Sequence, residues 1–180
     1  MERRRRKTRE AIVQSFVRLF FEDGYDAVSM GKIAAAADVG RSTLYTHFRR
    51  KEELLRASMD HHLNILADVV TATGQDALSR LMTHFWENRR RHSIFSPGAC
   101  RDALAGALAE LIEGRLNRPV SRGQQRPWRM PAAAASRLIA DHQLNLLDRW
   151  MGGHWAIGPP AMAGIMQDSV NGLRSGLQTE

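Results

Sequence analysis

The fold is decided by the stretch from Ser29 to Phe48, SMGKIAAAADVGRSTLYTHF. It divides into two short segments with helical periodicity, 30–37 and 41–47, which are separated by Asp-Val-Gly. The first segment is rich in alanine, so that a second helix can pack closely against it across a tight turn. The pattern therefore predicts a helix-turn-helix, whose inward-facing residues are Ile33, Ala34, Ala37, Val39 and Leu44.

The turn and the second helix have chemistry that suits this motif. Asp38 occupies a position at which such a turn usually has glycine, and aspartate tolerates the left-handed conformation better than most residues. Gly40 is predicted to be the N-cap of the second helix. The outward side chains of that helix can all hydrogen-bond to bases or phosphates: Arg41, Ser42, Thr43, Tyr45, Thr46 and His47. Either the helix lies in the major groove with its N-terminal residues on base edges, or its polar face meets only water.

A helix is predicted before this motif and a longer one after it. An apolar stripe predicts the first helix over 8–22, which ends at Gly24 in the left-handed conformation. A second stripe predicts a helix over 51–71, and two glutamates in its first turn are favourable to its dipole. We therefore place a helix-turn-helix domain at 1–50 and a second domain at 51–180.

The second domain also has helical periodicity. Apolar stripes predict helices around Leu81 and Leu108, followed by two long helices over 132–151 and 159–177. The segment 117–131 holds three Pro, one Gly and four Arg, a composition that predicts a loop. The sequence thus predicts an all-α chain of about nine helices.

Composition limits the class of protein. The chain has 180 residues, 43% of them hydrophobic, and a single Cys, so it forms one core or two and has no intramolecular disulfide. The basic stretch 3–7 lacks the following apolar run of a secretory signal, and no apolar stretch is long enough to span a bilayer. We therefore expect a soluble protein of the cytoplasm.

The positive charge is concentrated in the first third of the chain. Residues 1–56 hold 13 Lys+Arg and 8 Asp+Glu, whereas residues 57–180 hold 13 and 11. An uneven basic charge is typical of proteins that bind a polyanion, but a solvated surface has the same composition. The arm Arg3–Arg6 either lies along a groove of DNA or is an untethered tail.

Residues 8–56 resemble the DNA-binding domain of the TetR family of bacterial transcriptional regulators. The resemblance rests on IAAAADV at 33–39, STLYTHF at 42–48 and KEEL at 51–54. The Thr-Leu-Tyr-x-His-Phe string followed by Lys is among the most specific signatures of that family. The resemblance implies a three-helix DNA-binding domain, a C-terminal helical domain for ligand binding and dimerisation, and repression as the default activity.

The resemblance also implies roles for single residues. The DNA-binding candidates are Lys32, Arg41, Ser42, Thr43, Tyr45, Thr46, His47, Arg50 and Lys51. Among them, Arg41 and Thr43 would approach bases, and Tyr45, His47 and Lys51 would bind phosphates. Arg41 is the candidate for sequence specificity because a guanidinium pairs bidentately with guanine; the alternative is a phosphate contact.

Two positions depart from the family pattern. Gly31 lies where some members carry a base-contacting arginine, so the helix that contains it would contribute little to sequence readout. Arg50 replaces the usual Ser or Asn cap of the fourth helix, which exchanges a local cap for a charge directed at phosphate.

The resemblance assigns dimerisation and ligand binding to the second domain. The helices over 132–151 and 159–177 would pair with their two-fold copies as a four-helix bundle, through Leu138, Leu146, Trp150, Met162, Ile165, Met166, Val170 and Leu173. A dimer of this kind predicts a palindromic operator with half-sites about 34–36 Å apart or a near multiple of this distance. An unidentified small-molecule effector would lie among Phe85, Trp86, Cys100, Leu104, Leu108, Trp128 and His142. The alternatives are that the last two helices only close the core of the single chain, and that each of these seven residues belongs to ordinary core or loop packing.

Other functions have less support in the sequence. Cys100 has no histidine tied to it by a signature, so we interpret it as a structural thiol or a redox sensor. His61 and His62 are adjacent, so their rings point apart around a helix and make a poor metal site. We therefore expect no enzyme, no cofactor and no metal. The alternative to a specific regulator is a nonspecific architectural DNA-binding protein without an effector.

Overall fold

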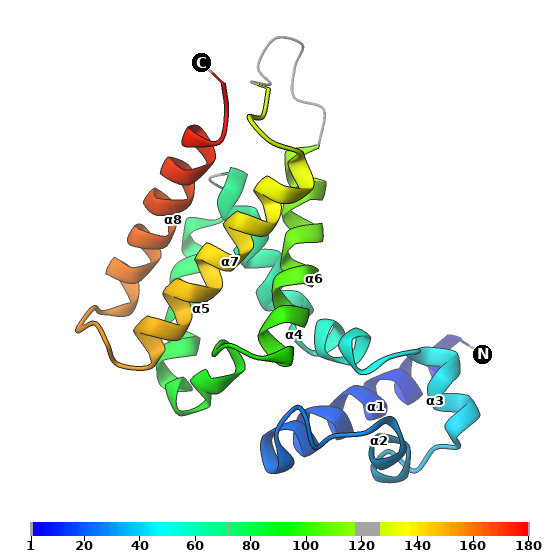
Figure 1. The fold of residues 1–180 in the computed structure, drawn as a ribbon. Helices are drawn as coiled ribbons and strands as arrows, with labels where there is room; N and C mark the ends of the chain where they lie inside the picture. Colours follow the sequence, from blue (N-terminus) through cyan, green and yellow to red (C-terminus); the bar gives the residue numbers. More distant parts are fainter. Residues whose placement is uncertain (1, 72, 118–126, 180) are drawn as a thin grey trace. The chain divides into compact units, whose positions relative to one another are not determined.

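The computed structural model describes residues 2–71, 73–117 and 127–179. Within these residues the chain forms eight α-helices and two short 3-10 helices, and it contains no β-strand (Figure 1). This confirms the all-α prediction, for which we expected about nine helices. The helices form two compact units, residues 1–60 and residues 61–180, and each is described by itself.

The first unit contains three helices and the first half of a fourth: α1 (Glu2–Asp23), α2 (Met30–Ala36), α3 (Arg41–His47) and the start of α4 (Lys51–Asp68). Its core is apolar and closed, because Ile12 and Phe16 of α1 are 0% and 1% exposed. Ser15 Oγ donates a hydrogen bond of 3.2 Å to the carbonyl oxygen of Ala36 and joins α1 to the end of α2.

The turns of the first unit have the predicted backbone. Gly24 has a φ of 82° after the end of α1, and Asp38 has a φ of 52° between α2 and α3, which is the left-handed conformation predicted for both. Gly40 is the N-cap of α3, as predicted. The side chain of Ser29 caps α2 by accepting a hydrogen bond from the backbone N–H of Lys32.

The start of α1 differs from the prediction. We expected this helix to begin at residue 8, where the apolar stripe begins, and α1 begins at Glu2. The arm Arg3–Arg6 therefore lies in the first turn and a half of a helix and is not an untethered tail, and its place along a groove of DNA stays a prediction. Arginine has a high helix propensity, so polar residues extend the helix beyond the part that packs on the core.

The second unit is built around α7 (Ala132–Met151). It also contains the end of α4, a 3-10 turn η1 (Val69–Thr71) and four further elements: α5 (Gln75–Glu87), η2 (Arg89–Ile94), α6 (Ala99–Leu116) and α8 (Pro159–Gly176). α7 packs against α6 and α8, and α5 packs against α8 (Figure 1). Nine side chains of α7 are buried, including two polar ones, Ser136 and Gln143.

The end of α4 and the following turn are held by side chains from two other helices, α7 and α8. Gln143 Nε2 donates to the carbonyl oxygen of Leu66 (3.0 Å) and Gln167 Nε2 to that of Val69 (2.8 Å). Arg174 donates to the carbonyl oxygen of Val70. Because the last carbonyls of a helix have no partner within it, these bonds satisfy groups that the helix end leaves open.

The predicted loop over 117–131 is described only in part, because residues 118–126 lie outside the described residues. The part before α7 pairs with the end of the chain. Trp128 and Gln178 form an isolated antiparallel bridge, and Thr179 N–H donates to the carbonyl oxygen of Pro127 (2.9 Å). No helix in the described part of the chain has both the length and the apolar character needed to cross a membrane.

Candidate nucleic-acid interface

The polar face of α3 is exposed and its apolar face is buried. Leu44 is 0% and Phe48 is 3% exposed, so these two side chains fix the helix to the first unit. Tyr45 is 50% exposed. The other candidates that lie exposed on α3 are Arg41, Ser42, Thr43 and Thr46. The hydrogen-bonding side chains therefore lie on the exposed face of a helix whose apolar face is packed against the first unit.

Arg41 lies against Gly31 of α2. A Cβ atom added at Gly31 would be 3.4 Å from Arg41 Nη2. Some members of the family that the sequence resembles carry an arginine at position 31, and the absence of a side chain here leaves room for the Arg41 guanidinium of the following helix. Arg41 remains exposed, so its N–H donors are available to a base edge or a phosphate.

Two other α3 residues have local interactions that change what they offer to DNA. Thr46 Oγ1 donates to the carbonyl oxygen of Ser42 (2.9 Å), so its hydroxyl can only accept a further bond. His47 is half-buried at the end of the helix. Burial lowers the pKa of His47, and the positive charges of Arg5 and Arg9 lower this pKa further.

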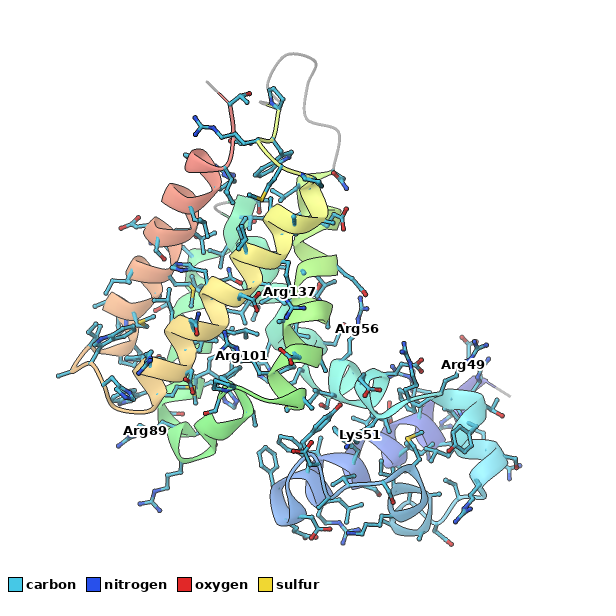
Figure 2. All side chains as sticks on the ribbon, in the orientation of Figure 1. Arg49, Lys51, Arg56, Arg89, Arg101 and Arg137 are labelled. Carbon is cyan, nitrogen blue, oxygen red and sulfur yellow. The ribbon has the colours of Figure 1, made fainter. Side chains whose placement is uncertain are left out.

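The two lysines among the candidates are engaged within the first unit. Lys51 begins α4 and is labelled in Figure 2. Its Nζ atom donates to the carbonyl oxygen of Tyr25 (2.6 Å) and lies 4.1 Å from the centroid of the Tyr25 ring. Lys32 Nζ is 3.1 Å from both Asp23 Oδ2 and the carbonyl oxygen of Ala27. These contacts join the loop after α1 to α2 and α4, so both lysines have a structural role, and their contact with DNA stays a prediction.

The start of α4 has a cap that the sequence analysis did not identify. Arg50 is exposed, as expected of a charge directed at phosphate. Glu53 Oε2 accepts a hydrogen bond of 2.8 Å from the backbone N–H of Arg49. A carboxylate in the first turn of a helix that reaches back to a preceding N–H replaces the missing Ser or Asn.

Comparison with known proteins decides the family. Residues 12–58 match the model of bacterial regulatory proteins of the tetR family. The Transposon Tn10 TetC protein of Escherichia coli is 32% identical over 155 residues, which are 79% of this chain and 71% of that protein. The chain belongs to the TetR family.

Two further TetR-family proteins show the extent of the likeness. The biofilm operon negative regulator IcaR of Staphylococcus epidermidis is 28% identical over 71 residues, and the match covers 39% of this chain and 38% of that protein. The crystal structure of the repressor FadR of Thermus thermophilus, solved in complex with lauroyl-CoA, has a TM-score of 0.50 at 21% identity and covers 96% of both chains. This second likeness shows that the fold is shared along the chain.

Two of the effector candidates of this TetR-family chain, Cys100 and Trp128, lie apart from each other. Phe85, Leu104 and Leu108 belong to the core, at 4%, 0% and 0% exposed. Cys100 lies in the first turn of α6. This turn is near the middle of α7, because the Nη2 atom of the next residue, Arg101, lies 3.4 Å from the carbonyl oxygen of Asp141. Trp128 precedes the first turn of α7 and pairs with the end of the chain. These two residues are therefore separated by more than two helical turns of α7.

The remaining two effector candidates have polar or aromatic partners. The ring of Trp86 stacks on that of Trp150, with centroids 5.0 Å apart, and Arg89 lies 4.7 Å from the Trp86 centroid. His142 Nε2 is 3.0 Å from Ser169 Oγ of α8. Both contacts join elements of the second unit to each other.

The dimer candidates of this TetR-family chain fall into two groups. Four are fully buried within the single chain and cannot contact a partner: Trp150, Met162, Met166 and Val170, each 0% exposed. They face the core because their spacing on α7 and α8 is that of the apolar stripe that packs within the unit. Leu138 and Ile165 are 45% and 40% exposed, and Leu146 and Leu173 are half-buried.

Proposed function

We propose that this TetR-family regulator is a sequence-specific repressor that acts in the cytoplasm, binds a palindromic operator as a dimer and is released by a small molecule. The observation that carries the proposal is the exposed polar face of α3 above the buried Leu44 and Phe48. A helix held in this way presents its N-terminal residues to base edges in the major groove. Arg41 is then the residue that reads sequence, through bidentate pairing with guanine.

Selection from a library of randomised DNA duplexes tests the proposal. We expect the wild type to select one palindromic sequence. Arg41→Ala would then lose discrimination at one base pair of each half-site, by about 1–3 kcal/mol. Gly31→Leu should act like Arg41→Ala because it fills the space that the guanidinium uses, whereas Gly31→Ala introduces only an ordinary contact at 3.4 Å and should bind like the wild type.

Two outcomes would contradict this assignment. If Arg41→Ala weakens binding to all sequences equally, then Arg41 contacts a phosphate and does not read a base. If the wild type binds selected and random duplexes equally at the same salt concentration, then the chain is a nonspecific architectural DNA-binding protein.

Open surface on α7 and α8 supports the dimer. Leu138 of α7 and Ile165 of α8 are large apolar side chains that remain exposed in the single chain. A Cβ atom added at Gly164, Gly172 or Gly176 would meet nothing within 4 Å. Small residues spaced by four or eight positions lie on one helix face and let a second helix approach closely. We therefore propose an interface that uses Leu138, Leu146, Ile165 and Leu173.

Light scattering at micromolar concentration tests the dimer. We expect twice the mass of the 20.3 kDa chain. The variant Ile165→Glu should give a monomer, because it places a charge in the proposed interface. Gln178→Glu, a change outside that interface, should leave the mass unchanged, and a wild-type monomer would contradict the proposal.

Two buried polar atoms on α7 support an effector site. Ser136 Oγ and Gln143 Oε1 lack a hydrogen-bond partner within the described residues, and both side chains are 0% exposed. Seven residues separate them, so both lie on the same face of the helix. Buried polar atoms are normally hydrogen-bonded. The two residues lie about 10.5 Å apart along the helix axis, so one polar group cannot bond to both. We therefore place the polar group of the effector at Gln143 Oε1, on a molecule that is otherwise apolar and that carries a hydrogen-bond donor.

A link from this position to α4 supports release by the effector. Gln143 also donates to the carbonyl oxygen of Leu66 at the end of α4, so a ligand that rotates the Gln143 amide alters one contact that holds this helix. Release requires that the ligand bind the two states with different affinity. Lauroyl-CoA, the ligand bound to FadR, is the first probe for thermal-shift experiments, together with a panel of amphipathic amides and alcohols.

The thermal shifts of the wild type and of Gln143→Leu are compared to test whether a compound binds at Gln143. A stabilising compound that binds wild type and not Gln143→Leu supports the site. A compound that stabilises both variants equally, or one that stabilises the wild type without weakening DNA binding, contradicts it.

A further inference from the structure

Arginines of α1 and the last residue of α3 surround a hollow on the surface of the first unit. The hollow has a volume of about 640 Å³ and is lined by Glu2, Arg3, Arg5, Arg6, Arg9 and His47. The start of α1 lies beside α3 within this unit (Figure 1). Four arginines and a single carboxylate therefore surround one concave surface, which gives it a strongly positive potential.

Two of these arginines are positioned toward the hollow and have no internal counterion. Arg5 and Arg9 are four residues apart, so they share one face of α1. No carboxylate lies within ion-pair distance of either guanidinium in the part of the chain that the structure describes. Arg6 differs, because it pairs with Glu10 at 3.6 Å. The charges of Arg5 and Arg9 are thus available to an external anion.

Arg9 is held in place by the core of the unit. Its guanidinium carbon lies 5.0 Å from the centroid of the Phe48 ring, and Phe48 is only 3% exposed. A cation held over an aromatic face has a preferred position, so less side-chain entropy is lost when it binds a ligand. The positive charges of both arginines also act on His47. Burial is the largest cause of the lowered pKa of His47, and the charges of Arg5 and Arg9 lower this pKa further.

A second hollow on the other side of His47 lacks this charge. It has a volume of about 420 Å³, and the charged side chains that line it are Arg9, Glu53, Arg56 and Asp60. Two acidic and two basic groups balance each other there. The net positive charge on the α1 side of His47 therefore favours an anion, whereas the balanced charge on the α4 side does not.

The arginines also reverse the charge of a helix end. The C-terminal end of a helix carries partial negative charge, which disfavours a phosphate, and His47 is the last residue of α3. Arg5 and Arg9 bring positive charge to this end from a second helix. Arg41 and His47 stand at opposite ends of α3, about 9 Å apart along the axis at about 1.5 Å per residue, so the far end of a helix in the major groove approaches the backbone of the duplex.

We propose that Arg5 and Arg9 form a binding site for a DNA backbone phosphate beside His47, at the end of α3 opposite to Arg41. The proposal rests on the proposed function, in which α3 enters the major groove. The guanidinium groups donate to the phosphate oxygens, as charged groups that recognise phosphate do. This contact carries no sequence information and fixes the orientation of the helix on the duplex.

Salt dependence of DNA binding tests the site without knowledge of the operator. The probe is a labelled duplex of arbitrary mixed sequence, about 30 base pairs long, and its affinity is measured by fluorescence anisotropy from about 50 to about 200 mM salt. Each lost phosphate contact lowers the slope of log affinity against log salt by about 0.9. We expect Arg9→Gln to lower the slope by about this amount per chain, and Arg5→Gln to do the same.

Two control variants separate a phosphate site from a general effect of charge. Arg18→Gln removes one exposed arginine from the same helix, nine residues away and on the opposite face, and it should leave the slope unchanged. Arg9→Lys keeps the charge and should retain most of the slope. Thermal unfolding of each variant, followed by circular dichroism, verifies that α1 still folds.

The outcomes distinguish failure of the phosphate site from failure of the proposed function. An unchanged slope in Arg9→Gln, or an equal loss in Arg18→Gln, overturns the phosphate site. A wild type with no sequence preference overturns the proposed function, while the difference between the slopes of Arg9→Gln and Arg18→Gln would still support a phosphate contact. Sequence preference that is unchanged in Arg5→Gln and Arg9→Gln, with weaker affinity for every duplex, supports both.

Discussion

Lys51 is half-buried, and its ammonium group donates to the carbonyl oxygen of Tyr25 and lies over the ring of the same residue. A hydrogen bond from a charged donor and a cation–π contact each contribute to stability. We expect Lys51→Ala to lower the free energy of unfolding by about 1–2 kcal/mol. Chemical denaturation of the full chain measures this loss, with Arg50→Ala as an exposed neighbour that should cost little.

The same pair of variants tests the role of Lys51 on DNA. Because its ammonium group is already bonded within the unit, Lys51→Ala should change the salt slope of DNA binding less than Arg9→Gln does. A full loss of one phosphate contact in Lys51→Ala, with stability unchanged, would restore the role that the family resemblance implies.

Residue types alone identified the exposed face of α3, but they did not identify the partners of the lysines on the neighbouring helices α2 and α4. The exposure of Arg41 and Tyr45 and the burial of Leu44 follow from helical periodicity, so the sequence predicted them. Lys32 and Lys51 were predicted to contact DNA from the family resemblance, and the sequence does not show which groups of the chain itself they contact. Their partners are backbone carbonyls of the loop after α1, and a carbonyl has no sequence signature.

At the scale of elements, the turn between α2 and α3 depends on one strained residue. Asp38 has a φ of 52°, and a left-handed residue with a Cβ costs about 1–2 kcal/mol. We expect Asp38→Gly to raise the free energy of unfolding by about 0.5–1 kcal/mol. We expect Asp38→Val to lower it by about 1–2 kcal/mol, because a branched Cβ is worse in this conformation.

Denaturant melts of the two variants measure both changes. The sign of each change is decisive. If Asp38→Gly lowered the free energy of unfolding, the aspartate side chain would make a stabilising contact that outweighs the backbone strain. If Asp38→Val raised the free energy of unfolding, the left-handed conformation would not be the source of strain. DNA affinity measured on the same samples reports whether the angle between the two helices changed.

Helix bounds were predictable wherever apolar residues or turn residues define them. The bounds of α3 and α7 agree with the prediction because Gly40, Pro131 and Gly152 stand next to the ends. The start of α1 was wrong because its first residues are arginines that form helix without packing on anything. The structure was needed to show that Trp150 and three α8 residues are buried within the single chain. An apolar stripe in the sequence does not show whether a helix of the same chain or a partner covers it.

At the scale of the whole molecule, histidines link stability to pH. Burial lowers the pKa of His62, and the neighbouring His84 and His61 lower it further. The ring of His62 stacks on that of His84 with centroids 5.2 Å apart. Burial also lowers the pKa of His142, and His47 has a lowered pKa for the reasons given above. All three groups therefore bind protons less readily in the folded chain than in the unfolded chain.

The direction of the pH dependence follows from this difference. Between the lowered pKa of each folded group and the ordinary value of about 6.5, the unfolded state binds more protons, so stability rises with pH. We expect the thermal midpoint to be highest above about pH 6.5 and to fall as the pH decreases toward about 5.5, where carboxylates remain ionised. His62→Gln should flatten this decline, because it removes one of the three groups whose pKa is lowered in the folded chain. A midpoint that rises on acidification from pH 7 would show that these histidines gain a favourable partner on protonation, and an identical decline in His62→Gln would show that the stacked pair is not its source.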